Sequence, residues 1–432
     1  MKRILTFIFC AICLTGFSQQ NLSLADAINI ALKNSYDIQL AKNNLEISSI
    51  NNNMGLAGGL PVVNAVATDN EQVTSINQKF ADPSRDTKRD NVGSNNLATG
   101  ITGGILIFNG YRVVATKKRL AELQLQNQQL LKVQIQNTIA AVMTKYYDIV
   151  RQQTYRKTIF QSIDVSKKRL DILQVRKDVG LSNNADIFQA QLDLNGLLQS
   201  QQSQELVIDH AKTDLLNLIF LKADTTITII DTIIIDKTVN LDSIRSYAKN
   251  NPLLLAATQQ IHINELIEKE TAALRYPTIR ATTGYNFTNS KSAAGFSLLN
   301  QSYGPFVGIS LAIPIYNGGI NKRQQQVAGI NTRNATILRD NLSLDYESAA
   351  VRTFQSYTNT IQQLKTEQQN YTLSTQLLDL VLQRFQLGQA TIIDVKQAQQ
   401  SFENEGYRLI NLNYAAKVAE IELKRLANQL AL

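Results

Sequence analysis

Few residues of this 432-residue chain have the types and spacing that enzyme or metal chemistry requires. The two histidines, His210 and His262, stand far apart, with no cysteine or second histidine at metal-ligand spacing. The carboxylates Glu268 and Glu270 lie in a helical pattern, where solvent exposure accounts for them. No phosphate loop, nucleophile elbow or His-Glu motif occurs in the sequence. We therefore expect no catalytic activity, no metal site and no cofactor.

Two stretches repeat one pattern of glycine, aspartate and glutamine. GLSNNADIFQAQ begins at Gly180 and GQATIIDVKQAQ begins at Gly388, and each places an aspartate, Asp186 or Asp394, at the same distance from its glycine. Each glycine follows a long helical run with basic residues near its end, which is typical of a C-terminal glycine cap. Each aspartate falls in the first turn of a returning helix, where the helix N-terminus favours a carboxylate. For Asp186, this helix-start role and a functional role are alternatives.

These two stretches belong to a tandem repeat of the whole chain. The offset that aligns them also aligns Phe108-Asn109-Gly110 with Tyr316-Asn317-Gly318. We divide the chain into a first repeat at 19–220, a linker at 221–240 whose β-branched residues favour a strand, and a second repeat at 241–432. Each repeat is expected to hold strands, a long helix and a hairpin tip. In the first repeat, the strands are expected at about 58–108, the long helix at about 110–178 and the hairpin tip at 179–186. In the second repeat, the strands are expected at about 276–316, the long helix at about 319–386 and the hairpin tip at 387–394.

Composition and the N-terminal residues indicate an exported, folded protein. Hydrophobic residues make up 44% and charged residues 18% of the chain. Lys2 and Arg3 precede an apolar run, which predicts a cleaved signal peptide at 1–18. Both cysteines, Cys10 and Cys13, lie in that segment, so the rest of the chain has neither disulfide nor thiolate. The net charge of +8 includes no long basic run, and we expect no nucleic-acid partner.

The expected long helices contain no proline, and a helix from Tyr111 to about Lys177 would reach on the order of 100 Å. Their apolar stripes are narrow, and the remaining positions are rich in glutamine, asparagine and lysine. This pattern favours coiled-coil neighbours with water on both sides of the helical layer. A solid cytoplasmic coiled coil is the alternative.

Alternating residues predict two strands in each repeat. In the second repeat, large apolar residues alternate with small or hydroxylic ones from Val307 to Ile315, and a similar alternation runs from Pro277 to Thr288. The first repeat offers Pro61 to Thr68 and Thr99 to Phe108. Each second-repeat run has about the length of a tilted transmembrane strand. The polar stretches between paired strands, 78–96 and 289–304, are expected to be exposed tips.

Four strands cannot form a closed transmembrane barrel, because the smallest such barrels use eight. An open edge in lipid leaves unpaired amides that cost several kcal/mol each. The strands therefore predict assembly with further copies, and spacing alone does not choose between two, three and four. A soluble sheet packed against a core of the same chain is the alternative.

Taken together, these features make the sequence resemble the TolC-like outer membrane efflux proteins of Gram-negative bacteria. The resemblance rests on the repeat, the Pro314-Ile315-Tyr316-Asn317-Gly318-Gly319 junction and the glycine-to-aspartate tips, and it covers nearly all of the chain after the signal peptide. It implies a mainly α fold with transmembrane β-strands, assembled as a homotrimer. Four strands per chain would form a twelve-stranded outer-membrane barrel, continued by a twelve-helix periplasmic α-barrel.

The resemblance implies a passive outer membrane exit duct of a tripartite efflux or type I secretion system. Its partners would be a periplasmic adaptor, an inner-membrane pump and outer membrane lipid. A long-helix scaffold of the periplasm or cell surface, without a conducting pore, is the alternative function.

The resemblance also places a periplasmic entrance at the tips, formed by Asp186, Phe385, Ala390, Asp394 and Gln397. Asp394 matches an acidic ring in which three carboxylates would raise one another's pKa and favour cations. Gln397 stands where well-known members have a second acidic ring. Phe385 and Ala390 stand where they have the tyrosine and arginine that tie the closed tip to the first-repeat aspartate. The closing bonds of this chain are therefore expected to differ.

Small and apolar residues at an otherwise polar tip suggest grooves for the helical hairpins of an adaptor, since small residues allow close approach of helices. The expected adaptor-binding residues are Val179, Gly180, Leu181, Ser182, Leu387, Gly388, Gln389, Ala390 and Thr391.

Overall fold

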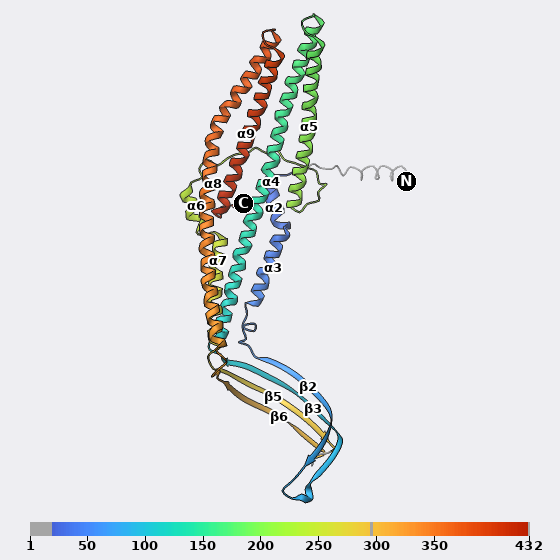
Figure 1. Ribbon diagram of the computed structural model, residues 1–432, viewed down its shortest axis with the longest axis vertical. Coiled ribbons are helices and arrows are strands. Elements are labelled where there is room, and N and C mark those ends of the chain that lie inside the picture. The colour runs from blue at the N-terminus through green and yellow to red at the C-terminus, as the bar shows by residue number, and fades with distance from the viewer. Residues whose placement is uncertain (1–19, 294–296, 431–432) are drawn as a thin grey trace, which may run out of the picture. The chain divides into compact units, whose positions relative to one another are not determined.

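The computed structural model describes residues 20–293 and 297–430, and it is built from long helices and one four-stranded sheet (Figure 1). The expected signal peptide lies outside the described residues. The chain divides into two compact units. The helical unit comprises the chain up to Asn43, Gln129–Leu255 and the chain from Asn341, and the sheet unit comprises Asn44–Gln128 and Ala256–Asp340.

The two halves of the chain present the same series of elements: two short helices, two strands, a helix of 67 residues and a helix of 35 residues. None of the helices in the described ranges is both long and apolar enough to cross a bilayer. The helices are α2 (Leu24–Asn34), α3 (Tyr36–Asn51), α4 (Arg112–Asp178), α5 (Asn184–Leu218), α6 (Leu241–Ala248), α7 (Pro252–Ala273), α8 (Ile320–Gln386) and α9 (Ile392–Leu426). The strands are β1 (Gln20–Asn21), β2 (Val62–Gln78), β3 (Thr87–Phe108), β4 (Ile227–Thr228), β5 (Thr278–Ser292) and β6 (Leu299–Ala312), with a 3-10 turn at Pro83–Arg85.

The sheet is antiparallel in the order β2-β3-β5-β6, so β2 and β6 are its edges (Figure 1). Its register aligns Val63, Gly103, Thr283 and Val307 across the four strands. Because side chains alternate between the two faces of a strand, this register assigns every position to a face. Large apolar side chains gather on the face of Val307, including Val63, Ile101, Tyr285, Phe287, Ile309 and Leu311.

The apolar face of the sheet is not covered by this chain. Val307 is 84% exposed and Ile309 is 75% exposed. A soluble sheet packed on its own core would bury these side chains. The single chain therefore leaves open an apolar surface that a lipid or another apolar partner has to cover.

The strands run further than the sequence predicted. Polar stretches expected to be exposed tips are largely paired, since β3 begins at Thr87 and β5 continues to Ser292. Backbone pairing continues there, as between Asn95 and Lys291, although the apolar alternation has stopped. Alternation reports which face is apolar, whereas the ladder depends only on the backbone, so polarity alone underestimated the strand lengths.

Each junction from strand to long helix uses two successive residues with positive φ. In the second repeat these are Gly318 and Gly319, and in the first they are Gly110 and Tyr111. A side chain in this conformation costs roughly 1–2 kcal/mol. Tyr111 packs edge-on against Phe108, with ring centroids 5.5 Å apart, which offsets part of that cost.

The main core of the helical unit joins α2, α4 and α5 to the linker between the repeats. Tyr146, Leu215 and Ile219 are buried there beside Ile227 and Ile229 of the linker. Within the expected linker strand, only the two residues of β4 pair, in parallel with β1.

Polar contacts bind the next part of the linker to α9. The Lys417 ammonium donates to the Ile234 carbonyl over 2.8 Å, and the Asp236 amide donates to Glu420 over 2.9 Å. Hydrogen bonds from Thr238, and then from Lys424, hold the pKa of Asp236 well below its ordinary value. The linker is thus anchored by buried and half-buried charges.

Candidate functional site

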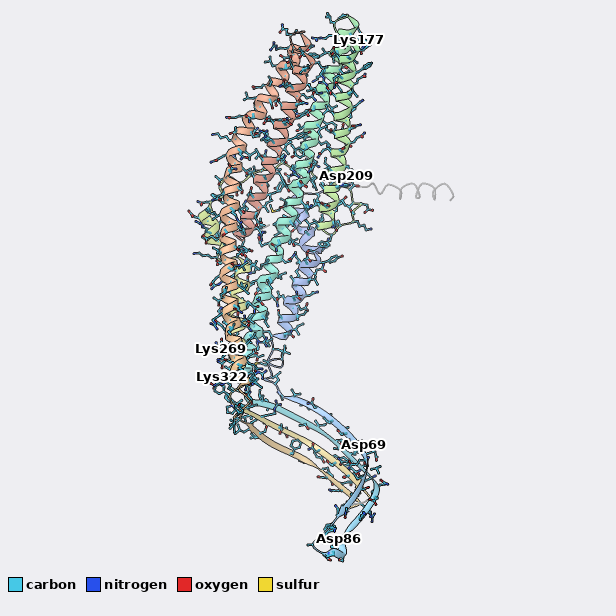
Figure 2. The ribbon with its side chains drawn as sticks, in the orientation of Figure 1. Asp69, Asp86, Lys177, Asp209, Lys269 and Lys322 are labelled. Atoms are coloured by element: carbon cyan, nitrogen blue, oxygen red, sulfur yellow. The ribbon has the colours of Figure 1, made fainter. Side chains whose placement is uncertain are left out.

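The first hairpin tip, between α4 and α5, is closed by backbone hydrogen bonds around Gly180. This glycine has φ +76°, and its amide donates to the Lys177 carbonyl over 2.9 Å. The Leu181 amide donates to the Arg176 carbonyl over 2.7 Å. These two bonds form the Schellman motif, in which a glycine ends a helix in the left-handed conformation. Figure 2 labels Lys177 in the last turn of α4.

The second tip, between α8 and α9, has the same geometry. Gly388 has φ +81°, and its amide donates to the Phe385 carbonyl over 3.1 Å. The Gln389 amide donates to the Arg384 carbonyl over 2.8 Å. Both glycines therefore act as C-caps, for the local reason that the sequence indicated.

The two aspartates start the returning helices. The side chain of Asn183 caps α5 by accepting from the Asp186 amide over 3.0 Å. Thr391 and Asp394 form a reciprocal capping box: the Thr391 amide donates to Asp394 Oδ2 over 2.7 Å, and the Asp394 amide donates to Thr391 Oγ1 over 3.2 Å. Hydrogen bonds to its carboxylate, first from the Thr391 amide and then from the Thr391 hydroxyl over 2.8 Å, lower the pKa of Asp394. Within one chain, Asp394 is thus a charged helix-capping residue.

Phe385 belongs to the core between the hairpins. It is 1% exposed and packs with Leu173, Ile187 and Val395. The Arg176 guanidinium lies 4.7 Å from the Phe385 ring centroid and donates through Nη2 to the Phe385 carbonyl. This contact joins the first hairpin to the second.

Of the other predicted entrance residues, Ala390 packs against the apolar cluster that contains Phe385, whereas Asp186, Asp394 and Gln397 are not part of that cluster. Asp394 and Gln397 are exposed, while Asp186 and Ala390 are half-buried. Among the residues expected to bind an adaptor, Val179, Leu181 and Leu387 are strongly exposed apolar side chains. Ile393, which the sequence did not single out, is similarly exposed.

A cluster of charges behind the tips links three helices. Asp193 of α5 accepts from Arg169 Nη2 of α4 over 2.8 Å and from Lys396 Nζ of α9 over 3.0 Å. The Arg169 side chain is 1% exposed. Partial burial opposes ionisation of Asp193, but hydrogen bonds from Lys396 and Gln189, with the nearby positive charges, lower its pKa overall. We call Asp193, Arg169 and Lys396 the hairpin clamp.

Sequence reasoning missed the hairpin clamp, although a signal was present. Val165, Arg169 and Leu173 succeed one another at four-residue steps, so Arg169 lies within the apolar stripe of α4. An arginine in a buried stripe requires a carboxylate partner. The sequence alone did not identify which aspartate that is.

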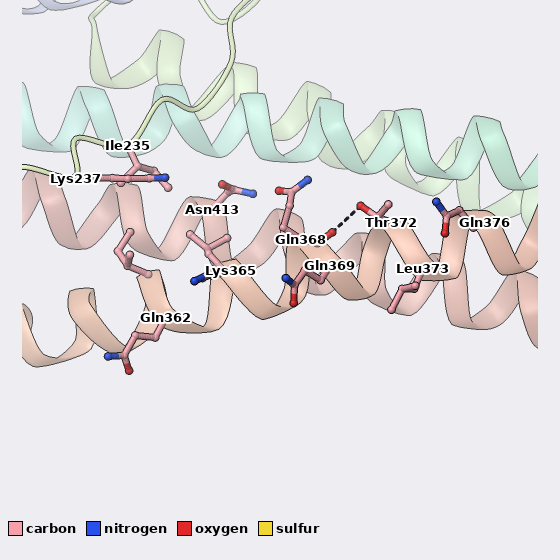
Figure 3. Close-up of a pocket in the computed structure, with 12 residues that line it drawn as sticks. Ile235, Lys237, Gln362, Lys365, Gln368, Gln369, Thr372, Leu373, Gln376 and Asn413 are labelled. Atoms are coloured by element: carbon pink, nitrogen blue, oxygen red, sulfur yellow. Dashed lines mark hydrogen bonds between the residues drawn. The ribbon is translucent and has the colours of Figure 1, made fainter.

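A groove of about 920 Å³ runs along α8 beside the linker (Figure 3). Its α8 wall contains four glutamines together with Ile361, Leu364 and Leu373, and Ile235 and Lys237 of the linker lie at one end. The Thr372 hydroxyl donates to the Gln368 carbonyl over 2.9 Å, so it is already satisfied by the helix. The described residues include no group of three or more histidine, cysteine, aspartate or glutamate side chains able to hold a metal ion. The surface of the groove is mostly apolar, and its lining residues include no catalytic constellation.

Comparisons with known proteins agree on one family. The profile of the family described as outer membrane efflux protein matches residues 27–220 and 244–429. The outer membrane protein TolC of Vibrio cholerae is 22% identical over 306 residues, which cover 67% of this chain and 67% of that protein. The outer membrane protein TolC of Escherichia coli is 21% identical over 357 residues, covering 78% and 70%.

Solved structures share the fold at low sequence identity. The outer membrane protein VceC of Vibrio cholerae has a TM-score of 0.77 and 16% identity, covering 94% of this chain and 95% of that chain. The outer-membrane channel OprN has a TM-score of 0.79 and 14% identity, covering 94% and 90%.

Proposed function

This chain belongs to the outer membrane efflux protein family, and from that premise we propose that three copies form an exit duct across the outer membrane and into the periplasm. The duct conducts substrates passively from an inner-membrane pump and its periplasmic adaptor to the exterior. The family is one of outer membrane channels rather than enzymes.

The observation that carries this proposal is the open, two-faced sheet. Its apolar face is exposed, and its edges β2 and β6 are unpaired in the sheet order of the described residues. In lipid, unpaired edge amides and carbonyls cost several kcal/mol each, so the sheet has to close. Pairing β2 of one copy with β6 of the next gives head-to-tail contacts that close into a ring. Three copies, as in the family fold, supply twelve strands.

Exposed side chains of the helical unit support the same ring. The Gln399 amide of α9 donates to the Ser162 carbonyl of α4 over 3.3 Å, so these two helices are neighbours. Figure 1 shows the order α8, α9, α4, α5, which leaves α5 and α8 at the edges. Both edges carry exposed apolar residues within a few turns of the tips. They are Phe188 and Leu192 on α5, and Leu373, Leu377 and Leu380 on α8. Packing α5 of one copy against α8 of the next buries both sets.

The scaffold alternative does not account for the exposed apolar face of the sheet. Fractionation of cells, followed by native mass measurement in detergent, separates the two functions. We expect the protein in the outer membrane fraction, soluble only with detergent, as a trimer that conducts ions in planar bilayers. A detergent-free soluble chain, or a trimer without conductance, would exclude the duct.

We further propose that the two tips bind the adaptor. Support comes from the exposed Val179, Leu181 and Leu387 around the capping glycines. The test is co-purification of a periplasmic adaptor with Gly388→Arg and with Gly388→Asn, because asparagine also tolerates the left-handed cap. Arginine should abolish capture and asparagine should retain it. Undiminished capture by the arginine variant excludes this surface.

A further inference from the structure

One charged side chain stands on the polar face of the four-stranded part of the sheet, and it belongs to Arg280. The register aligns Gly104, Thr282 and Gly308, and Arg280 lies two residues before Thr282 on the same face. The four-stranded part includes β2 from Val62 to Gln72 and the stretches of β3, β5 and β6 in the same rows. All remaining residues of this face are uncharged there. These residues are Val62, Asn64, Val66, Thr68, Asn70 and Gln72; Ser94, Asn96, Ala98, Gly100, Thr102, Gly104 and Leu106; Thr278, Thr282, Gly284, Asn286, Thr288, Ser290 and Ser292; and Asn300, Ser302, Gly304, Phe306, Gly308, Ser310 and Ala312.

The other charges of this part of the sheet lie on the apolar face. Asp69, Glu71 and Lys291 occupy that face, at the end of the four-stranded part opposite to Arg280 (Figure 2 labels Asp69). Asn95 Nδ2 donates to Asp69 over 2.6 Å and to Glu71 over 2.8 Å. The carboxylates of the four-stranded part therefore lie on the opposite face from Arg280 and are already hydrogen-bonded.

Arg280 is exposed, and apart from Leu106 its neighbours on this face are small residues. Its strand partners are Ser310 on β6 and Leu106 on β3, and the next residues along this face are Gly104, Thr282 and Gly308. Its Nη1 lies 3.8 Å from the position that a Cβ on Gly104 would take. The guanidinium thus extends over the neighbouring strand, where a larger side chain would limit its access.

We propose that Arg280 forms an anion-binding ring inside the duct, one guanidinium from each copy, and that it makes the sheet portion of the pore favour anionic solutes. The inference rests on the proposed function, because the polar face becomes the pore wall only when the sheet closes. Rings of arginine or lysine are a recurrent means of selecting anions in pores. A planar guanidinium also binds carboxylates and phosphates through two parallel hydrogen bonds.

The effect of this ring on ion selectivity can be detected only at low ionic strength. The screening length is about 8 Å at 0.15 M salt and about 30 Å at 0.01 M. A twelve-stranded barrel is wide, so the fields of three guanidiniums overlap across it only at low salt. Any anion preference from Arg280 should therefore be large in dilute salt and vanish near 1 M.

The test is the reversal potential of the full-length protein in planar bilayers under a KCl gradient. Arg280→Gln should lower the chloride-to-potassium permeability ratio by at least about twofold near 0.01 M salt. Arg280→Lys should retain most of the preference. The matched control is Lys291→Gln, which removes the same charge from the other face of the same strand and should leave the ratio unchanged.

The outcomes separate this inference from the proposed function. If the wild-type protein forms no channel, the duct itself is refuted. If it conducts and Arg280→Gln behaves as Lys291→Gln does, the duct stands and the arginine ring is wrong. That second result would also follow if a carboxylate of a neighbouring copy neutralised Arg280 in the assembly, and it would equally exclude the anion site.

Discussion

The hairpin clamp predicts that Asp193→Asn loosens the contact between the two hairpins. The substitution removes the charge that faces Arg169, whose side chain is 1% exposed, and also weakens the bond to Lys396. Breaking a fully buried ion pair from one side costs about 3–5 kcal/mol. Asp193 is 18% exposed and Lys396 is 43% exposed, so water replaces part of the loss. Asparagine also keeps one acceptor oxygen. We expect a loss of about 1–3 kcal/mol.

Hydrogen exchange measured by mass spectrometry on the detergent-solubilised protein tests this value. A loss of 1–3 kcal/mol raises the exchange rate of amides that open with the clamp by roughly 5- to 150-fold. The increase should be confined to the ends of α4 and α8 and the starts of α5 and α9. The matched control is Asp164→Asn, which removes the exposed partner of Lys168 on α4 and should change stability by less than about 1 kcal/mol.

The effect should depend on pH in one direction. Because the pKa of Asp193 is lowered in the folded protein, its contribution is complete above the ordinary carboxyl pKa and is lost as pH falls through the folded value. The difference between wild type and Asp193→Asn should therefore shrink below about pH 4. Equal exchange in the Asp193 and Asp164 variants, or an increase spread evenly along the chain, would refute the clamp.

Three further predictions concern single residues. Burial, and then the neighbouring Glu405, raise the pKa of Glu367 to about 7, so the folded protein loses stability as pH rises from about 4.5 to about 7. Glu367→Gln should therefore stabilise the protein by about 2 kcal/mol at pH 8 and have little effect near pH 4. Thermal unfolding at both pH values measures this difference. Gly180→Ala should destabilise the first tip by about 1 kcal/mol, because Gly180 has φ +76°. Gly196→Ala should stabilise the protein by a similar amount, because Gly196 lies inside α5 with open space around it. Denaturant titrations in which both substitutions change the free energy of unfolding in the same direction would contradict this. Asp394→Asn should shift the reversal potential in dilute KCl away from cations if the three carboxylates line the entrance, and an unchanged potential would remove Asp394 from it.

Features that depend on neighbouring residues were predictable from the sequence. Gly180 and Gly388 end their helices because an L side chain is disfavoured at positive φ, and Thr391 and Asp394 start α9 because they satisfy each other's amides. The two faces of the sheet followed from alternation between large and small residues, as from Val307 to Ile315. These interactions span only a few residues, so the local sequence contains the information that decides them.

The family resemblance supplied what local patterns could not. Four strands per chain are too few for a closed barrel from one chain, but this count does not determine how many copies assemble. The family profile matches both halves of the chain and places the protein among outer membrane channels. The alternation of apolar and polar residues in the strands was compatible both with such a channel and with a soluble sheet.

Only the tertiary structure decided which distant residues meet at the tips. The sequence by itself determined where the hairpins turn, yet Phe385 stood out only as a departure from the family's tyrosine. In the fold it is buried under Arg176, 209 residues away in the chain. Asp193 likewise joins Arg169, 24 residues away, to Lys396, 203 residues away. The packing of whole helices determines which of these distant residues meet. Burial makes the attraction between an arginine and an aspartate strong, and a local sequence pattern does not show which residues are buried together.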